Sequence, residues 1–316
     1  MPVLAIDLGG TNIKTGIVHN GTLMAVAQTP AHAKAKLEIN LDNASEALQN
    51  LVHTHHIPSD EMTGIGIAFP GIVDSNRQRV ISRYVKYGDA SEFDFRAWAQ
   101  QRWQLPLLLE NDARAALAGE WQTGVGKGFS DIVMITLGTG LGSAVLLDGK
   151  LLRGQHFIAG NLWGHVSINL NGDGCNCGYM GCLETEASTW VLNQKLKSHT
   201  GYQNSSLCNK DVLFADVFNE AANGDAVAKT MMQQCLHAWG MCAVNMVHAY
   251  DPELIIFSGG IMEQASIIIP YIQTMIDKYA WLPPGTVKVV KSEQPAYTSL
   301  LGLAYLIKTK NAGDKI

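Results

Sequence analysis

The residues with the clearest potential for chemistry are three cysteines and a histidine within the 18 residues that end at Cys182. Soft thiolates with one imidazole are typical zinc ligands, and the predicted set is His165, Cys175, Cys177 and Cys182. One residue separates the first two cysteines, so both sulfurs can point to a shared centre. Gly178 and Gly181 allow the chain to fold back and deliver the third. The spacing differs from that of a zinc finger, so the ion is expected to hold a loop together.

Two other interpretations of these thiols are a disulfide and unliganded buried cysteines. A disulfide between Cys175 and Cys177 would be strained, and the sequence shows no secretion signal that would indicate an oxidising compartment. The predicted site has no open fourth position, which is typical of structural and not of catalytic zinc. Such a site would hold His165 and Glu184 rigidly.

A second candidate is the acidic residue Asp112, which stands between a predicted strand at 105–109 and a predicted helix at 113–121. This position is at or near a helix N-cap, where exposed amides and the helix dipole are expected to favour the ionised carboxylate. The residue could be only a cap. It could also be a general base in a cleft at the carboxyl end of a sheet strand.

Two glycine-rich turns have the same surroundings. The first, with Asp7, Gly9, Gly10 and Thr11, joins predicted strands at 3–8 and 13–18; the second, 138–142, joins strands at 132–137 and 143–147. Since the glycines connect strands and do not open a helix, the dinucleotide fingerprint and the Walker loop are both excluded. Amides and the threonine hydroxyl could still bind phosphate, and Asp7 could organise Mg²⁺ through water. A plain hairpin with an acidic strand end is the alternative.

The repeated strand–turn–strand pattern predicts an internal duplication, with two lobes that clamp a nucleoside triphosphate across a cleft. A third glycine turn at Gly259 and Gly260 follows a predicted buried strand at 254–257, and could approach the adenosine end of the nucleotide. A simple strand-to-helix turn is the alternative there.

The elements that must position these residues are read from apolar periodicity. Further strands are predicted at 23–27, 62–69 and 287–290, and helices at 37–57, 93–103, 185–199 (capped by Thr185), 211–223, 225–250, 266–279 and 300–308. Residues 80–92 are predicted to be irregular and to line a cleft. The expected domains are a small lobe at 1–112, completed by the C-terminal helix at about 300–316, and a large lobe at 113–299 that carries the zinc loop 165–184.

Composition limits the classes of function. The chain has 316 residues, of which 47% are hydrophobic, and a formal net charge of −5. Without a basic block it lacks the footprint of a nucleic-acid-binding protein. No apolar run reaches the length of about 18 residues that a membrane span requires. The expected location is therefore the cytoplasm. Cys235 and Cys242 fall one heptad apart in a helical stretch and are expected to be buried apolar residues.

Together these stretches resemble the ROK family of repressors and sugar kinases, across essentially the whole chain. The resemblance is carried by Asp7-x-Gly9-Gly10-Thr11, by Leu137-Gly138-Thr139-Gly140-x-Gly142, by Ser258-Gly259-Gly260 and, most specifically, by the motif from Gly164-His165 through the zinc cysteines to Glu184. It implies an α/β protein with the actin-like, hexokinase-type ATPase fold, in which two lobes with duplicated sheet cores flank a central cleft.

The resemblance also implies an activity, which is ATP-dependent phosphorylation of a hexose, at the C6 hydroxyl, by a homodimer that uses Mg²⁺ and structural Zn²⁺. Asp112 matches the family's catalytic base. The matched sugar-binding positions are Gly71, Asn111, Asp112, Asn161, His165 and Glu184. The matched nucleotide-binding positions are Asp7, Gly9, Gly10, Thr11, Lys14, Gly138, Thr139, Gly140, Gly259 and Gly260.

The sequence departs from the family pattern before the zinc cysteines. The family has Gly-Glu-x-Gly-His, whereas this chain has Asn161 near the glutamate position and one extra residue. An amide donates as well as accepts hydrogen bonds, so an altered preference around C1 and C2 of the sugar is expected. Trp163 could stack on a sugar or be packed in the protein. Glucose, mannose, allose, fructose and N-acylated hexosamines all remain open as substrates.

Two other functions remain from the resemblance. ROK repressors share this body but carry an additional N-terminal helix-turn-helix, whereas this sequence begins at its first strand. A sugar-binding or regulatory protein without kinase activity is the other alternative. Retention of Asp112 favours the kinase over that alternative.

Overall fold

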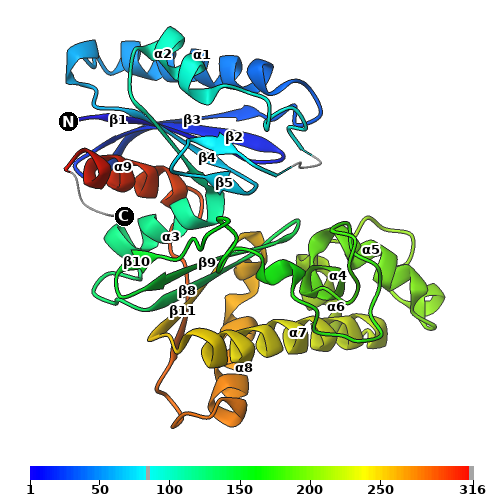
Figure 1. The fold of residues 1–316 in the computed structure, drawn as a ribbon. Coiled ribbons are helices and arrows are strands. Elements are labelled where there is room, and N and C mark those ends of the chain that lie inside the picture. The colour runs from blue at the N-terminus through cyan, green and yellow to red at the C-terminus, as the bar shows by residue number, and fades with distance from the viewer. Residues whose placement is uncertain (83–85, 313–316) are drawn as a thin grey trace. The chain divides into compact units, whose positions relative to one another are not determined.

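The computed structural model describes residues 1–82 and 86–312, which divide into two compact units (Figure 1). The first unit consists of residues 1–128, 150–159 and 293–316, and the second of residues 129–149 and 160–292. The boundary that the sequence predicted after Asp112 therefore lies inside the first unit, which continues through helix α3 (Asp112–Thr123).

The first unit is built on a sheet with the order β3-β2-β1-β4-β7. Its strands are β1 (Val3–Leu8), β2 (Asn12–His19), β3 (Thr22–Pro30), β4 (Ile65–Phe69) and β7 (Leu107–Asn111). β1, β2 and β3 are antiparallel neighbours, whereas β4 and β7 continue the sheet in parallel with β1. The parallel strands are almost continuously buried, as expected for strands with both faces covered.

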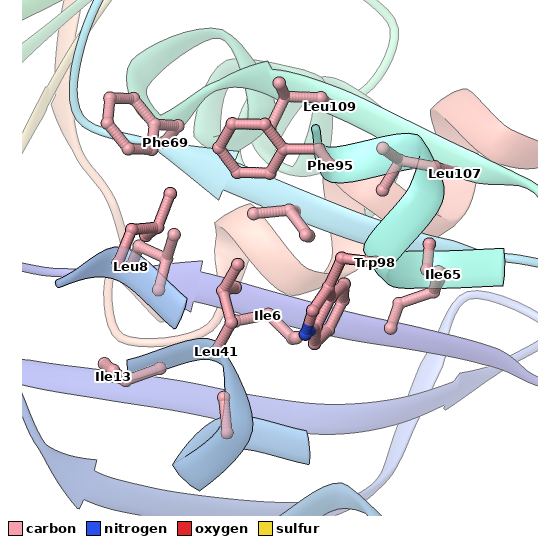
Figure 2. Close-up of a cluster of buried hydrophobic side chains, with 14 of the residues drawn as sticks. Ile6, Leu8, Ile13, Leu41, Ile65, Phe69, Phe95, Trp98, Leu107 and Leu109 are labelled. Carbon is pink, nitrogen blue, oxygen red and sulfur yellow. The ribbon is translucent and has the colours of Figure 1, made fainter. Parts of the chain in front are cut away.

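Helices α1 (Leu37–Thr54) and α2 (Phe95–Trp103) cover one face of this sheet, and α9 (Thr298–Asn311) covers the other (Figure 1). Figure 2 shows the core under α1 and α2, where Phe69, Phe95 and Trp98 pack with aliphatic side chains of the strands. On the opposite face α3 packs closely on α9. A β-carbon added to Gly119 or Gly302 would collide with backbone atoms of the facing helix, so both positions require glycine. The short elements of this unit are η1 (Ser59–Glu61), β5 (Val73–Asp74) and β6 (Arg79–Val80).

The second unit repeats this arrangement. Its strands β9, β8, β11 and β12 lie side by side in that order, with β8 and β9 antiparallel and β8, β11 and β12 parallel. Their bounds are β8 (Ile132–Leu137), β9 (Leu141–Leu147), β11 (Leu254–Ser258) and β12 (Lys288–Lys291). β10 (Lys150–Leu151) follows β9 along the chain. Because the order and directions match those of β2, β1, β4 and β7, the predicted internal duplication is confirmed.

The helices of the second unit form a layer around the long helix α7 (Ala226–Tyr250), which packs on α8, α6 and α4. The others are α4 (Leu183–Ala187), α5 (Thr189–Ser198), α6 (Phe214–Ala222) and α8 (Ala265–Tyr279), with short turns η2 (Trp163–His165), η3 (Tyr202–Asn204) and η4 (Gly260–Gln264). Cys235 and Cys242 are buried in α7, as predicted. No helix in the described part of the chain is long and apolar enough to cross a membrane.

The single helix predicted at 185–199 with Thr185 as its cap is wrong. The chain turns into α4 directly after Cys182, and the Thr185 hydroxyl donates a hydrogen bond back to the Cys182 carbonyl at 2.7 Å. Ser188 then adopts an extended conformation that separates α4 from α5. The helix is interrupted there because the next two amides, those of Thr189 and Trp190, donate to carbonyls of the second glycine turn.

Candidate active site and metal centre

In the first unit Asp112 is held at the junction of β7 and α3. Asn111, and not Asp112, occupies the N-cap position, and its side-chain oxygen accepts a hydrogen bond from the Arg114 amide at 3.1 Å. The Asn111 amide nitrogen donates to the Gly71 carbonyl at 3.0 Å and to the Asp112 carboxylate at 2.9 Å. The asparagine therefore fixes both the start of the helix and the orientation of the acid beside it.

A buried ion cluster anchors the same helix start. Arg114 is fully buried, and its guanidinium donates to the carbonyls of Leu152, Phe157 and Ala159 at 3.0–3.1 Å. Glu110 lies between two arginines and pairs with Arg153 at 2.7 Å. These contacts fix the 152–159 segment against α3 within the first unit.

The pKa of Asp112 is raised to about 7, first by its removal from water and then by the negative charge of Asp7. Hydrogen bonds from the Ala113 amide and the Asn111 side chain oppose this shift but are smaller. The sequence-based expectation that backbone amides favour the ionised form holds for their own contribution, but burial and the like charge of Asp7 outweigh it, so the net pKa is raised. A carboxylate with a pKa close to neutral is suited to accept a proton.

The first glycine turn lies between β1 and β2, where Asp7 stands at the end of β1. The Ser299 hydroxyl donates to the Asp7 carboxylate at 2.7 Å, and Lys14 is the cross-strand neighbour of Asp7. Burial raises the pKa of Asp7, while Ser299 and Lys14 act to lower it. Asp7 therefore brings a second acidic group into the electrostatic environment of Asp112.

Within this turn the backbone of Gly9 is already occupied by hydrogen bonds within the protein. Its amide donates to the Asp7 carbonyl at 3.1 Å, its carbonyl accepts from the Tyr87 hydroxyl at 2.7 Å, and a β-carbon here would collide with the Asn12 carbonyl. Over the described residues, the structure records no acceptor for the amides of Gly10 and Thr11. Of the three amides predicted to bind phosphate, these two are available.

The first unit also fits the predicted magnesium ion. The charge of Asp7 helps to raise the pKa of Asp112, and both carboxylates are oxygen ligands of the kind that Mg²⁺ binds directly or through water. A cation beside Asp7 would reduce the repulsion between them.

The second glycine turn, between β8 and β9, is held by Glu184 of α4. One carboxylate oxygen of Glu184 accepts from the Leu141 amide at 2.9 Å, and the other accepts from the Trp190 indole at 3.1 Å. The amides of Thr189 and Trp190 donate to the carbonyls of Gly138 and Thr139, each at 3.2 Å. Glu184 was predicted to contact the sugar. In the structure its carboxylate also holds the predicted phosphate turn in place through the Leu141 amide.

The predicted adenosine turn lies beside this one. Gly259 has a φ of +97°, and a β-carbon on it would collide with the Leu137 carbonyl at the start of the second glycine turn. The pairing of β8 with β11, up to Thr136 and Ser258, brings the two turns together. Gly260 is exposed and has open space around its α-carbon.

The four predicted metal ligands come together in the second unit. The ligand atoms of His165, Cys175, Cys177 and Cys182 all lie within 4.8 Å of one another. Histidine Nδ1 lies 3.6 Å from the Cys175 sulfur, and the sulfurs of Cys177 and Cys182 are also 3.6 Å apart. Zinc–sulfur bonds of about 2.3 Å in a tetrahedron require neighbouring ligand atoms about 3.7 Å apart, so the donor set fits zinc.

The loop geometry explains how the sequence makes this cluster. Gly178 and Gly181 have φ values of +90° and +64°, and a β-carbon on Gly181 would collide with the Asn169 carbonyl. These are the two glycines that the sequence assigned to folding the chain back. Cys175, Cys177 and Cys182 are all free thiols, so each sulfur can act as a ligand.

Asn161 and Trp163 are both occupied by contacts inside the second unit. Asn161 is buried, and its amide donates to the Ser143 carbonyl of β9 at 3.0 Å. Trp163 packs edge-on against Tyr250, with its indole donating to the tyrosine hydroxyl at 2.9 Å. The packed alternative for Trp163 is therefore confirmed, whereas the effect of Asn161 on sugar preference stays a prediction.

Sequence reasoning missed four residues that contact these turns, namely Lys86, Tyr87, Trp190 and Ser299. Lys86 and Tyr87 lie in the stretch that was predicted to be irregular and to line a cleft, without a role for either residue, and Ser299 lies just before the predicted terminal helix. None of them belongs to a motif. The Ser299 contact spans almost the whole chain, so no local pattern could have indicated it.

Comparisons with known proteins agree with the geometry. The ROK family profile matches residues 3–310. A glucokinase of Thermotoga maritima is 31% identical over 99% of each chain. A glucokinase of Halalkalibacterium halodurans is 30% identical, over 88% of this chain and 86% of its own. Among solved structures, a ROK family glucokinase from Streptomyces griseus in complex with glucose and AMPPNP has a TM-score of 0.79 at 25% identity, covering 98% of this chain and all of the other.

Proposed function

The chain belongs to the ROK family, and from that premise we propose that it transfers the terminal phosphoryl group of ATP to a hydroxyl of a hexose, with Asp112 as the general base. The family and the glucokinase relatives make the protein an ATP-dependent sugar kinase. The choice of Asp112 as the base and of the C6 hydroxyl as the acceptor is our proposal.

The observation that carries the proposal is the environment of Asp112. Its pKa of about 7 makes the carboxylate a stronger base than an ordinary aspartate, yet one that is still ionised in a large fraction of molecules near neutral pH. Asn111 holds one carboxylate oxygen in place at 2.9 Å. A base that is oriented in this way requires little rearrangement before it accepts a proton.

The proposed step is an in-line displacement. The sugar oxygen forms a bond to the γ-phosphorus as the bond from that phosphorus to the bridging oxygen of ADP breaks. Asp112 accepts the hydroxyl proton, and ADP leaves with the electron pair of the broken bond. General-base assistance of this kind typically contributes about 10²–10⁴-fold to the rate.

Positioning of the nucleotide accounts for much of the remaining catalysis, because phosphoryl transfer depends mainly on alignment and charge neutralisation. We assign the free amides of Gly10 and Thr11 and the turn 138–142 to the phosphates, and Gly259 to the adenosine. Mg²⁺, held through Asp7, would neutralise phosphate charge when bound.

The zinc loop has a positioning role in this proposal. Zinc would fix Cys182 at the start of α4, and α4 carries Glu184, which holds the second turn through the Leu141 amide. His165 is itself in the ligand set. We therefore assign His165 and Glu184 to the sugar side of the site, as the family resemblance implies, and zinc to their support.

The test is ADP release from Mg-ATP, measured with a panel that includes glucose, mannose, allose, fructose and N-acylated hexosamines. The proposal predicts strong turnover with at least one hexose. If Asn161 alters recognition near C1 and C2, the best substrate will be a sugar other than glucose. A zinc-replete protein that releases no ADP with any of these sugars would contradict the proposal.

A further inference from the structure

Lys86 lies on the first glycine turn without being part of any predicted motif. A β-carbon placed on Gly10 would come within 2.8 Å of Cε and 3.0 Å of Cδ of Lys86, with its ammonium group closer still. The end of the lysine side chain therefore lies over the α-carbon of Gly10. The ammonium group therefore lies near the amides of Gly10 and Thr11, which have no acceptor among the described residues.

The backbone next to Lys86 is anchored, which makes this placement specific. Tyr87 is 1% exposed, its amide donates to the Ala33 carbonyl at 2.8 Å, and its hydroxyl donates to the Gly9 carbonyl at 2.7 Å. Two hydrogen bonds thus tie the neighbour of Lys86 to the body of the first unit and to the turn itself. The lysine is only partly exposed, unlike a freely solvated surface side chain.

The charge of Lys86 has no recorded partner within the described residues, where none of the ion pairs involves it. Lys14, the other lysine near this turn, instead faces Asp7 across the strand pair. A lysine ammonium beside two available amides, with no acid paired to it, is suited to bind the oxygens of a polyphosphate ligand.

We propose that Lys86 is a catalytic residue that contacts the terminal phosphates of ATP and neutralises charge as the phosphoryl group is transferred. This inference rests on the proposed kinase function and adds a residue to it. Lysine acts here as a point charge and exchanges no proton with the substrate. Removal of a cation that stabilises a transferring phosphoryl group typically costs orders of magnitude in rate.

The experiment compares the wild type with Lys86→Met, which keeps the length of the side chain, and with Lys86→Arg, which keeps its charge. Lys127→Met is the matched control, because Lys127 is an exposed lysine of the same unit. Turnover is measured with the best sugar, and equilibrium binding of Mg-ATP, AMP and the sugar phosphate product is measured by calorimetry.

We expect Lys86→Met to lower kcat by about 100-fold and to weaken Mg-ATP binding by about 10-fold. Binding of AMP should be unchanged, Lys86→Arg should recover part of the loss, and Lys127→Met should match the wild type. Equal behaviour of Lys86→Met and Lys127→Met would overturn the proposal. An equal loss of affinity for AMP and for ATP in Lys86→Met would also overturn it, because it would indicate a structural role. A loss of affinity for the sugar phosphate alone would overturn it as well.

The binding measurements separate this proposal from the kinase assignment. If the wild type turns over no sugar, the proposed function fails, and selective loss of ATP over AMP binding in Lys86→Met still supports a phosphate-contacting lysine. If the wild type is active and Lys86→Met is equally active, the kinase assignment stands and the role of Lys86 is refuted.

Discussion

The two glycine turns follow equivalent strands of equivalent sheets, yet different contacts hold them. The first turn is held by Tyr87 and by its own backbone, and has acidic groups and a lysine around it. The second turn is held from outside, by Glu184 and by amides at the start of α5. The two units thus share a backbone arrangement but carry different side chains around their turns, with the proposed base Asp112 in the first unit and the candidate zinc ligands in the second.

The largest expected effect comes from removing zinc. Structural zinc contributes about 10 kcal/mol or more of apparent binding free energy, so a chelator should unfold the 165–184 loop and release Glu184 from the second turn. Activity should fall by at least about 100-fold. Because the first turn is held by residues of its own unit, the pKa of Asp112, followed by carboxyl carbon NMR, should stay at about 7. A changed titration of Asp112 after chelation would show that the two turns are not independent.

The same substitution in the two turns should have different outcomes. Gly9→Ala places a β-carbon against the backbone carbonyl of Asn12, whereas the nearest atom to a β-carbon on Gly138 is 4.0 Å away. Gly9→Ala should therefore lower the free energy of unfolding by about 1–3 kcal/mol. Gly138→Ala should change it by less than about 0.5 kcal/mol.

Urea denaturation of the two alanine variants measures this difference. Equal free energies of unfolding would mean that the tight packing of Gly9 has no energetic consequence.

The pH dependence tests the electrostatic difference between the turns. Asp112 must be ionised to accept a proton, so kcat/KM should be lost as the pH falls through about 7. Since the charge of Asp7 contributes to raising the pKa of Asp112, Asp7→Asn should move the titration of Asp112 in the free protein to lower pH.

Carboxyl NMR of the free protein measures this shift without requiring activity. An unchanged titration of Asp112 in Asp7→Asn would show that the charge of Asp7 does not raise the pKa of Asp112.

The smallest effect is expected at Ser299, whose hydroxyl donates to Asp7 at 2.7 Å and helps to lower its pKa. Ser299→Ala should raise the pKa of Asp7 further and lower the free energy of unfolding by about 1 kcal/mol. NMR titration and thermal unfolding measure the two changes.

The matched control for this variant is Ser45→Ala. Ser45 is a buried serine of α1 in the same unit, and it has no recorded contact with Asp7 among the described residues. The titration of Asp7 should therefore be unchanged in Ser45→Ala. The same titration of Asp7 in both variants would mean that the Ser299 hydroxyl has no specific effect on that carboxyl.

Much of this organisation could be predicted from sequence because it is local. The candidate zinc ligands are close in the chain, and the two strand–turn–strand units repeat the same residue types, so both patterns are visible in the sequence. Periodicity also located the buried strands and the long helix α7.

What sequence could not predict depends on contacts distant in the chain. The raised pKa of Asp112 comes first from burial and then from the charge of Asp7, which is distant from it in the sequence. The Asp7 contact with Ser299 likewise joins opposite ends of the chain. The break at Ser188 follows from hydrogen bonds to a turn much earlier in the chain, which outweigh the local helical pattern. Tyr87 and Lys86 could not be predicted as part of the site either, because their contacts with the first glycine turn also join distant parts of the chain.

The most direct test of the account is a single-turnover measurement of phosphoryl transfer by Asp112→Asn, with ATP binding measured on the same protein. Asparagine preserves the size of the side chain and removes the base. We predict a rate of transfer lower by about 10²–10⁴-fold, with ATP affinity within about threefold of the wild type. Transfer at the wild-type rate would contradict the assignment of Asp112 as the general base.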